Sequence, residues 1–277
     1  MSAETASGFP FRLVATDLDG TLLRSDHTVS VRTRDALAAA TAAGAAHIVV
    51  TGRSVRWTKH ILDDLGYGGL AVCGQGSQLY HAGEHRLLTS VTLDRQQARL
   101  ALSKIEAEVG RLAVAVSRDG VDGDVLFGPG YRLQGETTLP STLVSGEDEL
   151  WELPVNKLYL QHPGGMGDDA LAEAARRTAG GLVSVVVSGE GIVEMLPLGL
   201  SKARGLSMAA RRLGASAAST IAFGDMPNDI PMFAWAAHGV AMGGAHPELL
   251  AVADEVTASN DEDGIAVVLE RLLGDGR

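Results

Sequence analysis

The chain has 277 residues, of which 45% are hydrophobic, and this is enough for one large domain or two modest ones. Lysine and arginine total 23 against 34 aspartate and glutamate residues, so the net charge is −11 and nucleic acid is excluded as a general partner. Cys73 is the only cysteine, which excludes an internal disulfide and favours the reducing cytoplasm. No apolar run reaches the ~20 residues of a membrane span, so no membrane partner is expected.

Strands and helices alternate through the first 80 residues. Apolar runs predict buried strands at 13–15, 48–50 and 70–73, and helical patterns at 31–43 and 55–65 lie between them. Each run ends in polar or glycine residues. Repeated βα units of this kind indicate a parallel sheet, in which ligands bind beyond the carboxyl ends of the strands.

The pattern changes between residue 83 and about residue 194. Amphipathic helices are expected at 93–109 and 168–178, and glycine-rich stretches at 120–130 and 164–167 are expected to be loops. Short strands are expected at 112–116, 158–161, 182–187 and 192–195. This combination indicates an inserted α+β domain.

The βα alternation resumes after the insertion. A helix is expected at 201–213 with Ser201 as its N-cap, followed by a strand at 220–223, a short helix from about Ile230 and an apolar run at 239–242. The predicted fold is therefore α/β, with a doubly wound, Rossmann-like parallel sheet and an inserted α+β cap.

The changes in the pattern of predicted elements near residues 83 and 194 also predict the domain boundaries. We expect a discontinuous core of residues 1–82 and 195–277, and an inserted domain of residues 83–194. Five residues of the inserted domain are each expected on the solvated surface, although one or two of them could instead contact a substrate: Arg118, Asp119, Asp124, Lys157 and His162.

The segment Asp17-Leu18-Asp19-Gly20-Thr21-Leu22 stands where the first strand meets a tight turn. Asp17 and Asp19 would repel one another unless a hard divalent cation such as Mg²⁺ lay between them, which leaves Asp17 as a possible nucleophile and Asp19 as an acid or base. The alternative is a solvated Asp-Gly turn, and this segment alone does not decide between them.

A second acidic segment, Gly224-Asp225-Met226-Pro227-Asn228-Asp229, follows the strand at 220–223. Asp225 and Asp229 add two carboxylates and Asn228 adds an amide, a set that suits a metal site. The alternative is a helix start capped by Asp229, which explains one aspartate and not the pair.

Two further segments supply groups that bind anions. Thr51, Gly52 and Arg53 follow the second strand, where a hydroxyl and main-chain N–H groups at a helix start can hold phosphate oxygens, although an ordinary helix start would look the same. Lys202 lies in the first turn of its helix, where the helix dipole disfavours a cation, so it either faces an anion or is an ordinary surface lysine.

Taken in this order, the four segments resemble the motifs of the haloacid dehalogenase (HAD) superfamily of phosphohydrolases, of the Cof type with a large α/β (C2B-like) cap. The resemblance runs from about residue 13 to residue 273 and is weak over residues 83–194. It implies that residues 1–82 and 195–277 are the catalytic core and that residues 83–194 are the cap that sets substrate specificity. It implies that Asp17 is the nucleophile that becomes an aspartyl-phosphate and that Asp19 is the general acid and base. The phosphate-binding residues would be Thr51, Gly52, Arg53, Lys202 and Asn228. The Mg²⁺ ligands would be Asp17, Asp19 through its main-chain carbonyl, Asp225 and Asp229.

One segment departs from the family pattern. Cof-type proteins usually have Asn-Gly-Ala after the third strand, whereas this chain has Gly74-Gln75-Gly76-Ser77, and the longer amide of Gln75 would change contacts there. His47, inside an apolar run, is expected to be a core residue. The tryptophans are isolated in sequence and are assigned to packing, because an aromatic substrate cage needs a cluster that the sequence does not show; they are Trp57, Trp151 and Trp235.

The sequence therefore predicts a Mg²⁺-dependent phosphatase that hydrolyses a small phosphorylated metabolite, a sugar phosphate or a biosynthetic intermediate, through an aspartyl-phosphate. A phosphomutase is the alternative closest in chemistry. A phospho-accepting or binding protein on the same scaffold is another, although Asp19 would hasten the loss of a signalling phosphate. The oligomeric state stays open.

Overall fold

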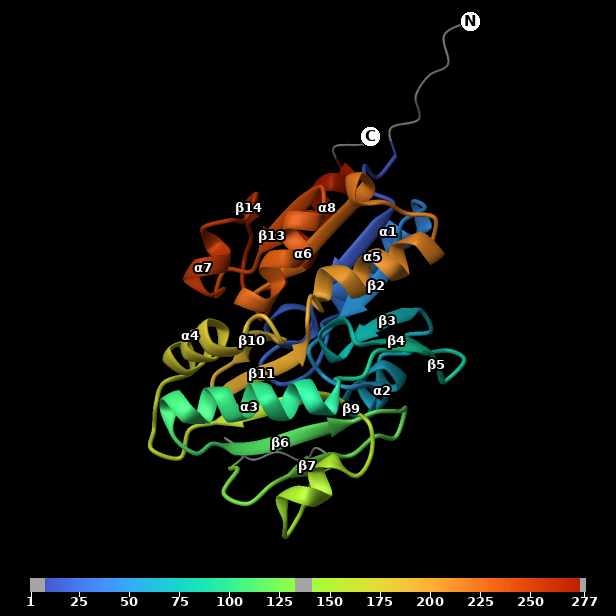
Figure 1. Ribbon diagram of the computed structural model, residues 1–277. Helices are drawn as coiled ribbons and strands as arrows, with labels where there is room; N and C mark the ends of the chain where they lie inside the picture. Colours follow the sequence, from blue (N-terminus) through green and yellow to red (C-terminus); the bar gives the residue numbers. More distant parts are fainter. Residues whose placement is uncertain (1–7, 133–140, 275–277) are drawn as a thin grey trace, which may run out of the picture. The chain divides into compact units, whose positions relative to one another are not determined.

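The computed structural model describes residues 8–132 and 141–274 (Figure 1). The chain divides into two compact units, Met1–Val50 with Leu206–Arg277, and Thr51–Gly205. These boundaries follow strand β2 and fall within helix α5 (Lys202–Arg212). The expected division into a core and a cap has other boundaries and stays a prediction.

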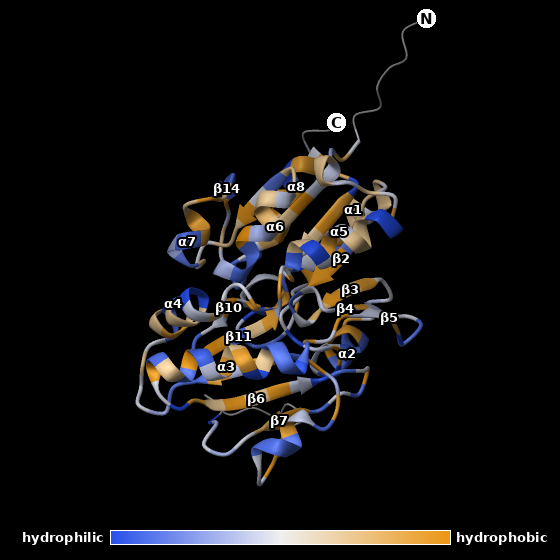
Figure 2. Cartoon of the chain, in the orientation of Figure 1, coloured by the Kyte–Doolittle hydropathy of each residue, from blue (hydrophilic) through white to orange (hydrophobic). Residues whose placement is uncertain are grey.

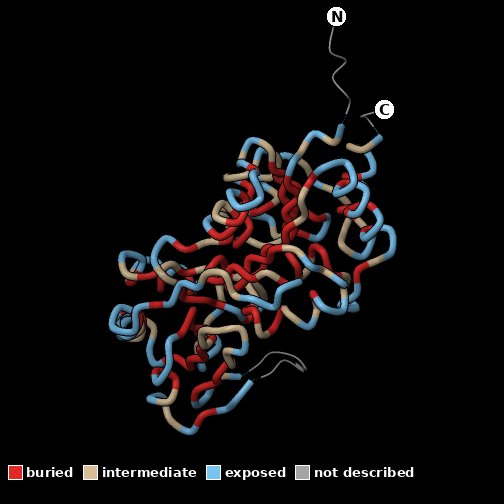
Figure 3. Tube along the Cα trace, turned by 90° about the vertical axis from the view of Figure 1, so that its right-hand side faces the viewer, coloured by how far each residue is buried: buried red, intermediate tan, exposed pale blue. Residues whose placement is uncertain are grey.

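The strands of the first unit lie in the order β14-β13-β12-β1-β2, and each neighbouring pair is parallel. They are β1 (Leu13–Thr16), β2 (Ala46–Val50), β12 (Thr220–Gly224), β13 (His238–Ala241) and β14 (Glu255–Val256). Every residue of β1 and β12 is buried. Figure 3 shows that buried segments of the chain lie mainly inside and exposed segments mainly at the periphery. The α/β fold with a parallel sheet is confirmed.

The helices of this unit include α1 (Val31–Ala42), α6 (Ile230–Trp235), α7 (Pro247–Leu250) and α8 (Gly264–Gly274). The sequence predicted α1 and α6 and missed α7 and α8. Helix α1 begins at Ser30, whose side chain accepts a hydrogen bond from the Thr33 N–H, and it packs against α8. The two acidic segments form short helical turns directly after strands β1 and β12. These turns are η1 (Leu18–Leu22) after β1 and η5 (Pro227–Asp229) after β12.

The second unit begins with helix α2 (Val55–Asp64) and three strands. These are β3 (Leu70–Cys73), β4 (Gln78–His81) and β5 (Arg86–Ser90), and β4 pairs antiparallel with both β3 and β5. The sequence predicted β3 and missed β4 and β5. No residue of β5 is buried, so it lacks the apolar run by which the other strands were recognised.

A six-stranded sheet forms the rest of this unit, in the order β10-β11-β9-β6-β7-β8. Its strands are β6 (Ala113–Arg118), β7 (Val125–Phe127), β8 (Ser141–Leu143), β9 (Val155–Gln161), β10 (Val183–Gly189) and β11 (Ile192–Pro197). The stretch 120–130 was expected to be a loop, and this was wrong for β7, whose three residues are too few to show a period.

Helices α3 (Arg95–Val109) and α4 (Asp168–Ala179) pack against each other and share one apolar core with the six-stranded sheet. In Figure 2 apolar and hydrophilic residues alternate along α3, as expected of a helix that buries one face. The predicted α+β character of this region is confirmed. In the part of the chain that the structure describes, no helix is both long and apolar enough to cross a membrane.

Candidate active site

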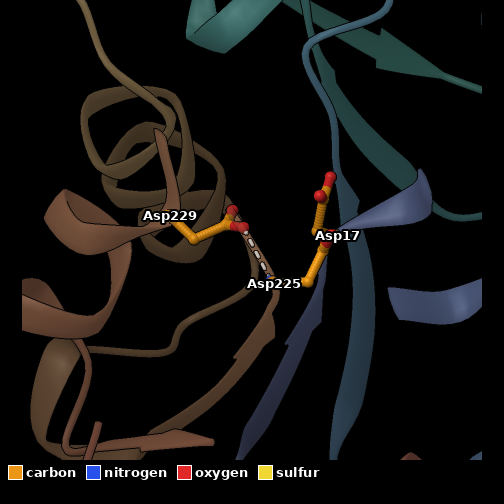
Figure 4. A group of neighbouring side chains, drawn as sticks. All are labelled: Asp17, Asp225 and Asp229. Carbon is orange, nitrogen blue, oxygen red and sulfur yellow. Dashed lines mark hydrogen bonds between the residues drawn. The ribbon is translucent and has the colours of Figure 1, made fainter. Parts of the chain in front are cut away.

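Three carboxylates of the first unit meet at the carboxyl ends of β1 and β12 (Figure 4). Asp17, Asp225 and Asp229 each place one oxygen within 4.8 Å of the others. The pairing of β1 with β12 explains this, because the register sets Thr16 opposite Phe223 and therefore ends both strands at the same level. The Asp17 N–H continues the ladder by donating to the Phe223 carbonyl at 3.0 Å.

The turn after β1 is shaped to fit Asp225. Gly20 has φ +72°, and a Cβ atom there would lie 2.3 Å from Asp225 Oδ2. Thr21 Oγ1 donates a hydrogen bond to Asp225 Oδ1 at 2.8 Å. Glycine is therefore required at position 20 both for its backbone conformation and for the close approach of a carboxylate.

Asp229 has two roles in this group. Its Oδ2 accepts hydrogen bonds from the N–H groups of Asp225 (3.0 Å) and Met226 (3.1 Å), and its side chain is fully buried. The capping role and the metal-site role, considered as alternatives from the sequence, are therefore compatible. Asn228 is buried beside it. Asp19 is partly exposed, in an extended conformation, and its carboxylate is not part of this group.

The donor set of this acidic group suits a hard cation. Three carboxylates this close repel one another, and a divalent ion bound by oxygen ligands removes that repulsion. Among the described residues no sulfur or imidazole ligand belongs to the group, so its chemistry matches Mg²⁺ rather than the thiolate-rich sites of structural zinc.

The predicted phosphate-binding loop Thr51–Arg53 lies in the second unit and is held by main-chain hydrogen bonds. The Thr51 N–H donates to the Val72 carbonyl at 2.8 Å, and the Gly74 N–H donates to the Arg53 carbonyl at 2.7 Å. The Arg53 N–H donates to Thr51 Oγ1 at 3.1 Å, which orients that hydroxyl.

Lys202 is 1% exposed, so it is not the ordinary surface lysine of the alternative interpretation. It begins α5 directly after Ser201, whose Oγ accepts from the Arg204 N–H at 3.4 Å as predicted for an N-cap. A Cβ atom on Gly76 would lie 2.3 Å from the Ser201 carbonyl oxygen. The start of α5 therefore packs directly on the loop that follows β3.

Gln75, the residue that departs from the family pattern, joins a buried polar network. Its Nε2 donates to Glu194 Oε2 at 2.7 Å, and Glu194 forms an ion pair with Lys157, whose Nζ also donates to the Gly52 carbonyl at 2.6 Å. Burial lowers the pKa of Lys157, partly offset by Glu194. The expectation that Lys157 is a surface residue was wrong, since it is 1% exposed.

Two other expectations concern residues away from the acidic group. His47 is partly buried and contacts Thr16 Oγ1 through Nε2 at 2.9 Å, and burial lowers its pKa to about 4. It is therefore a neutral, hydrogen-bonded residue at the edge of the core rather than a fully buried one. Trp57 packs in a hydrophobic cluster with Phe127 and Tyr159, as its assignment to packing predicts, although these residues come from distant parts of the sequence and the cluster is not visible there.

The comparisons with known proteins agree with this fold. A family model described as haloacid dehalogenase-like hydrolase matches residues 14–269. The chain is 28% identical to the 5-amino-6-(5-phospho-D-ribitylamino)uracil phosphatase of Bacillus subtilis, covering 95% of this chain and 98% of that protein.

Solved structures give the same result. A haloacid dehalogenase-like hydrolase from Bacillus subtilis is 26% identical with a TM-score of 0.79, and the match covers 95% of this chain and 100% of that one. A sugar phosphatase of HAD subclass IIB is 21% identical with a TM-score of 0.76, over 94% of this chain and 98% of its own, and this likeness shows the fold alone. With a family model that spans nearly the whole chain, the protein belongs to the haloacid dehalogenase-like hydrolases.

Proposed function

We propose that this protein is a Mg²⁺-dependent phosphatase that hydrolyses a phosphate monoester of a small metabolite through an aspartyl-phosphate on Asp17. The observation that carries the proposal is the group of three carboxylates at the ends of β1 and β12. Family membership and the phosphatase named above support it. We place the reaction in the cytoplasm because the chain has a single cysteine.

The metal would be held by the carboxylates of Asp17, Asp225 and Asp229, with the main-chain carbonyl of Asp19 as the ligand that the family resemblance implies. When bound, Mg²⁺ supplies positive charge that offsets the repulsion between an attacking carboxylate and a phosphate dianion.

The side chains of the protein carry the two half-reactions. A carboxylate oxygen of Asp17 attacks phosphorus, and the bond from phosphorus to the ester oxygen breaks while Asp19 protonates the leaving oxygen. Asp19, now a carboxylate, then takes a proton from the water that attacks the aspartyl-phosphate, which releases phosphate and regenerates Asp17. We assign the binding of phosphate oxygens to the Thr51–Arg53 loop, Lys202 and Asn228.

The test measures release of inorganic phosphate from a panel of phosphorylated metabolites, with Mg²⁺ or with EDTA. Release should require Mg²⁺ and should fall at least about 10³-fold in Asp17→Asn. Asp35→Asn is the control, because Asp35 is an exposed residue of α1 outside the acidic group.

Other outcomes would identify the alternatives. Near-normal release by Asp17→Asn would remove Asp17 as the nucleophile. Transfer of phosphate between two sugar hydroxyls without release would indicate a mutase. A stable phosphoprotein, or binding without reaction, would indicate a phospho-accepting or binding protein.

A further inference from the structure

The six-stranded sheet of the second unit has two chemically different faces. Leu158 and Leu160 of β9 belong to the core that α3 and α4 share. The alternate residues Lys157 and Tyr159 point to the opposite face, since side chains alternate along a strand. Glu194 of β11 pairs with Tyr159 in the register and therefore lies on that same face. This face carries charged and aromatic side chains.

A pocket opens on this second face, with about 430 Å³ of empty volume, its open mouth included. Four aromatic residues line it, together with Ile192 and the charged residues Arg132 and Glu190; the aromatic residues are Trp57, Phe127, Tyr131 and Tyr159. The rings of Trp57 and Tyr159 stack with centroids 6.4 Å apart, and those of Phe127 and Tyr131 with centroids 5.4 Å apart. The aromatic lining is that of a site for flat rings.

Tyr159, one of the residues that line the pocket, carries a buried polar atom without a hydrogen-bond partner among the described residues. The residue is 5% exposed, and this atom is its hydroxyl oxygen. A buried hydroxyl without a partner is costly, so a ligand atom that pairs with it would recover that cost. Burial raises the pKa of Tyr159, which keeps the phenol protonated and able to donate.

The pocket adjoins the predicted phosphate-binding loop within the same unit. Lys157 Nζ lies 4.7 Å from the centroid of the Tyr159 ring and donates to the Gly52 carbonyl at 2.6 Å. Trp57 comes from α2, which begins two residues after Arg53. One lysine thus contacts both the loop and the aromatic lining, so a molecule whose phosphate lies on the loop has a pocket for its other end.

We infer that this pocket binds the leaving group of the substrate and that this group carries a heteroaromatic ring. The ring would pack against the aromatic lining beside Trp57 and Tyr159, and a ring nitrogen or oxygen would accept a hydrogen bond from the Tyr159 hydroxyl. The inference rests on the proposed phosphatase function and narrows its substrate class to phosphate esters of heteroaromatic alcohols.

Three matched phosphate esters test the inference by equilibrium binding. Benzyl phosphate and cyclohexylmethyl phosphate differ in ring aromaticity, and 3-pyridylmethyl phosphate adds a ring nitrogen. Dissociation constants are measured with Mg²⁺ in an Asp17→Asn background, so that turnover does not interfere. We expect 3-pyridylmethyl phosphate to bind about 5- to 100-fold more tightly than cyclohexylmethyl phosphate.

Variants assign the preference to the pocket. In Trp57→Leu the ratio of the dissociation constants of cyclohexylmethyl phosphate and benzyl phosphate should fall close to one. Trp57→Phe should retain most of the ratio found without this substitution. Tyr159→Phe should abolish the preference for pyridyl over benzyl without loss of stability, because the hydroxyl has no partner among the described residues. Trp235→Leu removes a tryptophan outside the pocket and should leave the preference as it is.

Equal binding of the aromatic and saturated esters would overturn the inference, as would tighter binding of glucose 6-phosphate than of any ring ester. A loss in Trp57→Leu that is the same for all three esters would also overturn it. Failure of the proposed function is a separate result, since it appears as no phosphate release from any ester by the chain with Asp17 and Mg²⁺.

Discussion

Lys157 and Glu194 form an ion pair in which the two side chains are only 1% and 2% exposed. The pair joins two neighbouring strands, β9 and β11, on the face that carries the aromatic pocket. Each partner also reaches a loop of the same unit, Lys157 through the Gly52 carbonyl and Glu194 through the Gln75 amide. The pair therefore fixes the predicted phosphate-binding loop to the sheet.

Glu194→Gln should lower the free energy of unfolding by about 3–5 kcal/mol, because it leaves the Lys157 ammonium buried without its counter-charge. Urea denaturation measures this loss. The double variant Lys157→Met with Glu194→Leu should recover much of it. Glu270→Gln is the control, since the Arg32–Glu270 pair is exposed and its loss should cost at most about 1 kcal/mol. A double variant as unstable as the single one would contradict this account.

Gly20→Ala should destabilise the protein more than Gly44→Ala does. Both glycines have positive φ, but a Cβ atom on Gly20 would lie 2.3 Å from Asp225 Oδ2, and one on Gly44 would have no atom within 4 Å. Gly44→Ala therefore measures the backbone strain alone, about 1 kcal/mol. We expect Gly20→Ala to cost a further ~1–3 kcal/mol by thermal denaturation in EDTA and to weaken Mg²⁺ binding. Equal losses would show that Asp225 moves aside freely.

The acidic group could be predicted from the sequence because its information is local. Asp17 and Asp225 each follow a short buried run, and parallel strands bring the ends of such runs to one edge of the sheet. The aromatic pocket could not be predicted in this way. Trp57 and Tyr159 lie on different elements, and only the packing of the second unit brings their rings together.

The burial of Lys157 illustrates a second limit of sequence patterns. The alternation in β9 places Lys157 and Tyr159 on one face, which normally indicates a face exposed to solvent. The lysine is buried because Glu194, from the neighbouring strand, neutralises it. The alternation of side chains along β9 shows which residues share a face of the sheet. The residue that neutralises Lys157, however, is known only from the register between β9 and β11.

Metal binding should reverse the effect of Asp225→Asn on stability. In EDTA this variant should be as stable as the wild type or up to about 1 kcal/mol more stable, because it removes one charge from three crowded carboxylates. With Mg²⁺ the wild type should gain thermal stability by mass action and the variant should not. Thermal unfolding with and without Mg²⁺ measures both effects. An equal Mg²⁺-dependent gain in both proteins would place the ion elsewhere.

The free energy of unfolding should fall as the pH drops from about 6.5 to about 4. His47 has its pKa lowered to about 4 by burial, so in this window the unfolded chain binds a proton that the folded chain does not. The contribution of His47 to the free energy of unfolding is complete above pH 6.5 and amounts to about 1–3 kcal/mol. Urea denaturation across this range should give a shallower dependence for His47→Gln. An unchanged slope would assign the acid sensitivity to other groups.

Cys73 should resist thiol reagents while the protein is folded. It ends β3 with no exposed surface, and burial raises its pKa to about 12, so the reactive thiolate is scarce at neutral pH. Reaction with a disulfide reagent should therefore proceed at the rate of unfolding in native buffer and reach one thiol per chain at once in urea. Because Cys73 directly precedes the Gly74–Gly76 turn that packs on α5, fast native labelling would mean that this turn opens readily. Enzyme activity that survives long incubation with the reagent would agree with a closed turn.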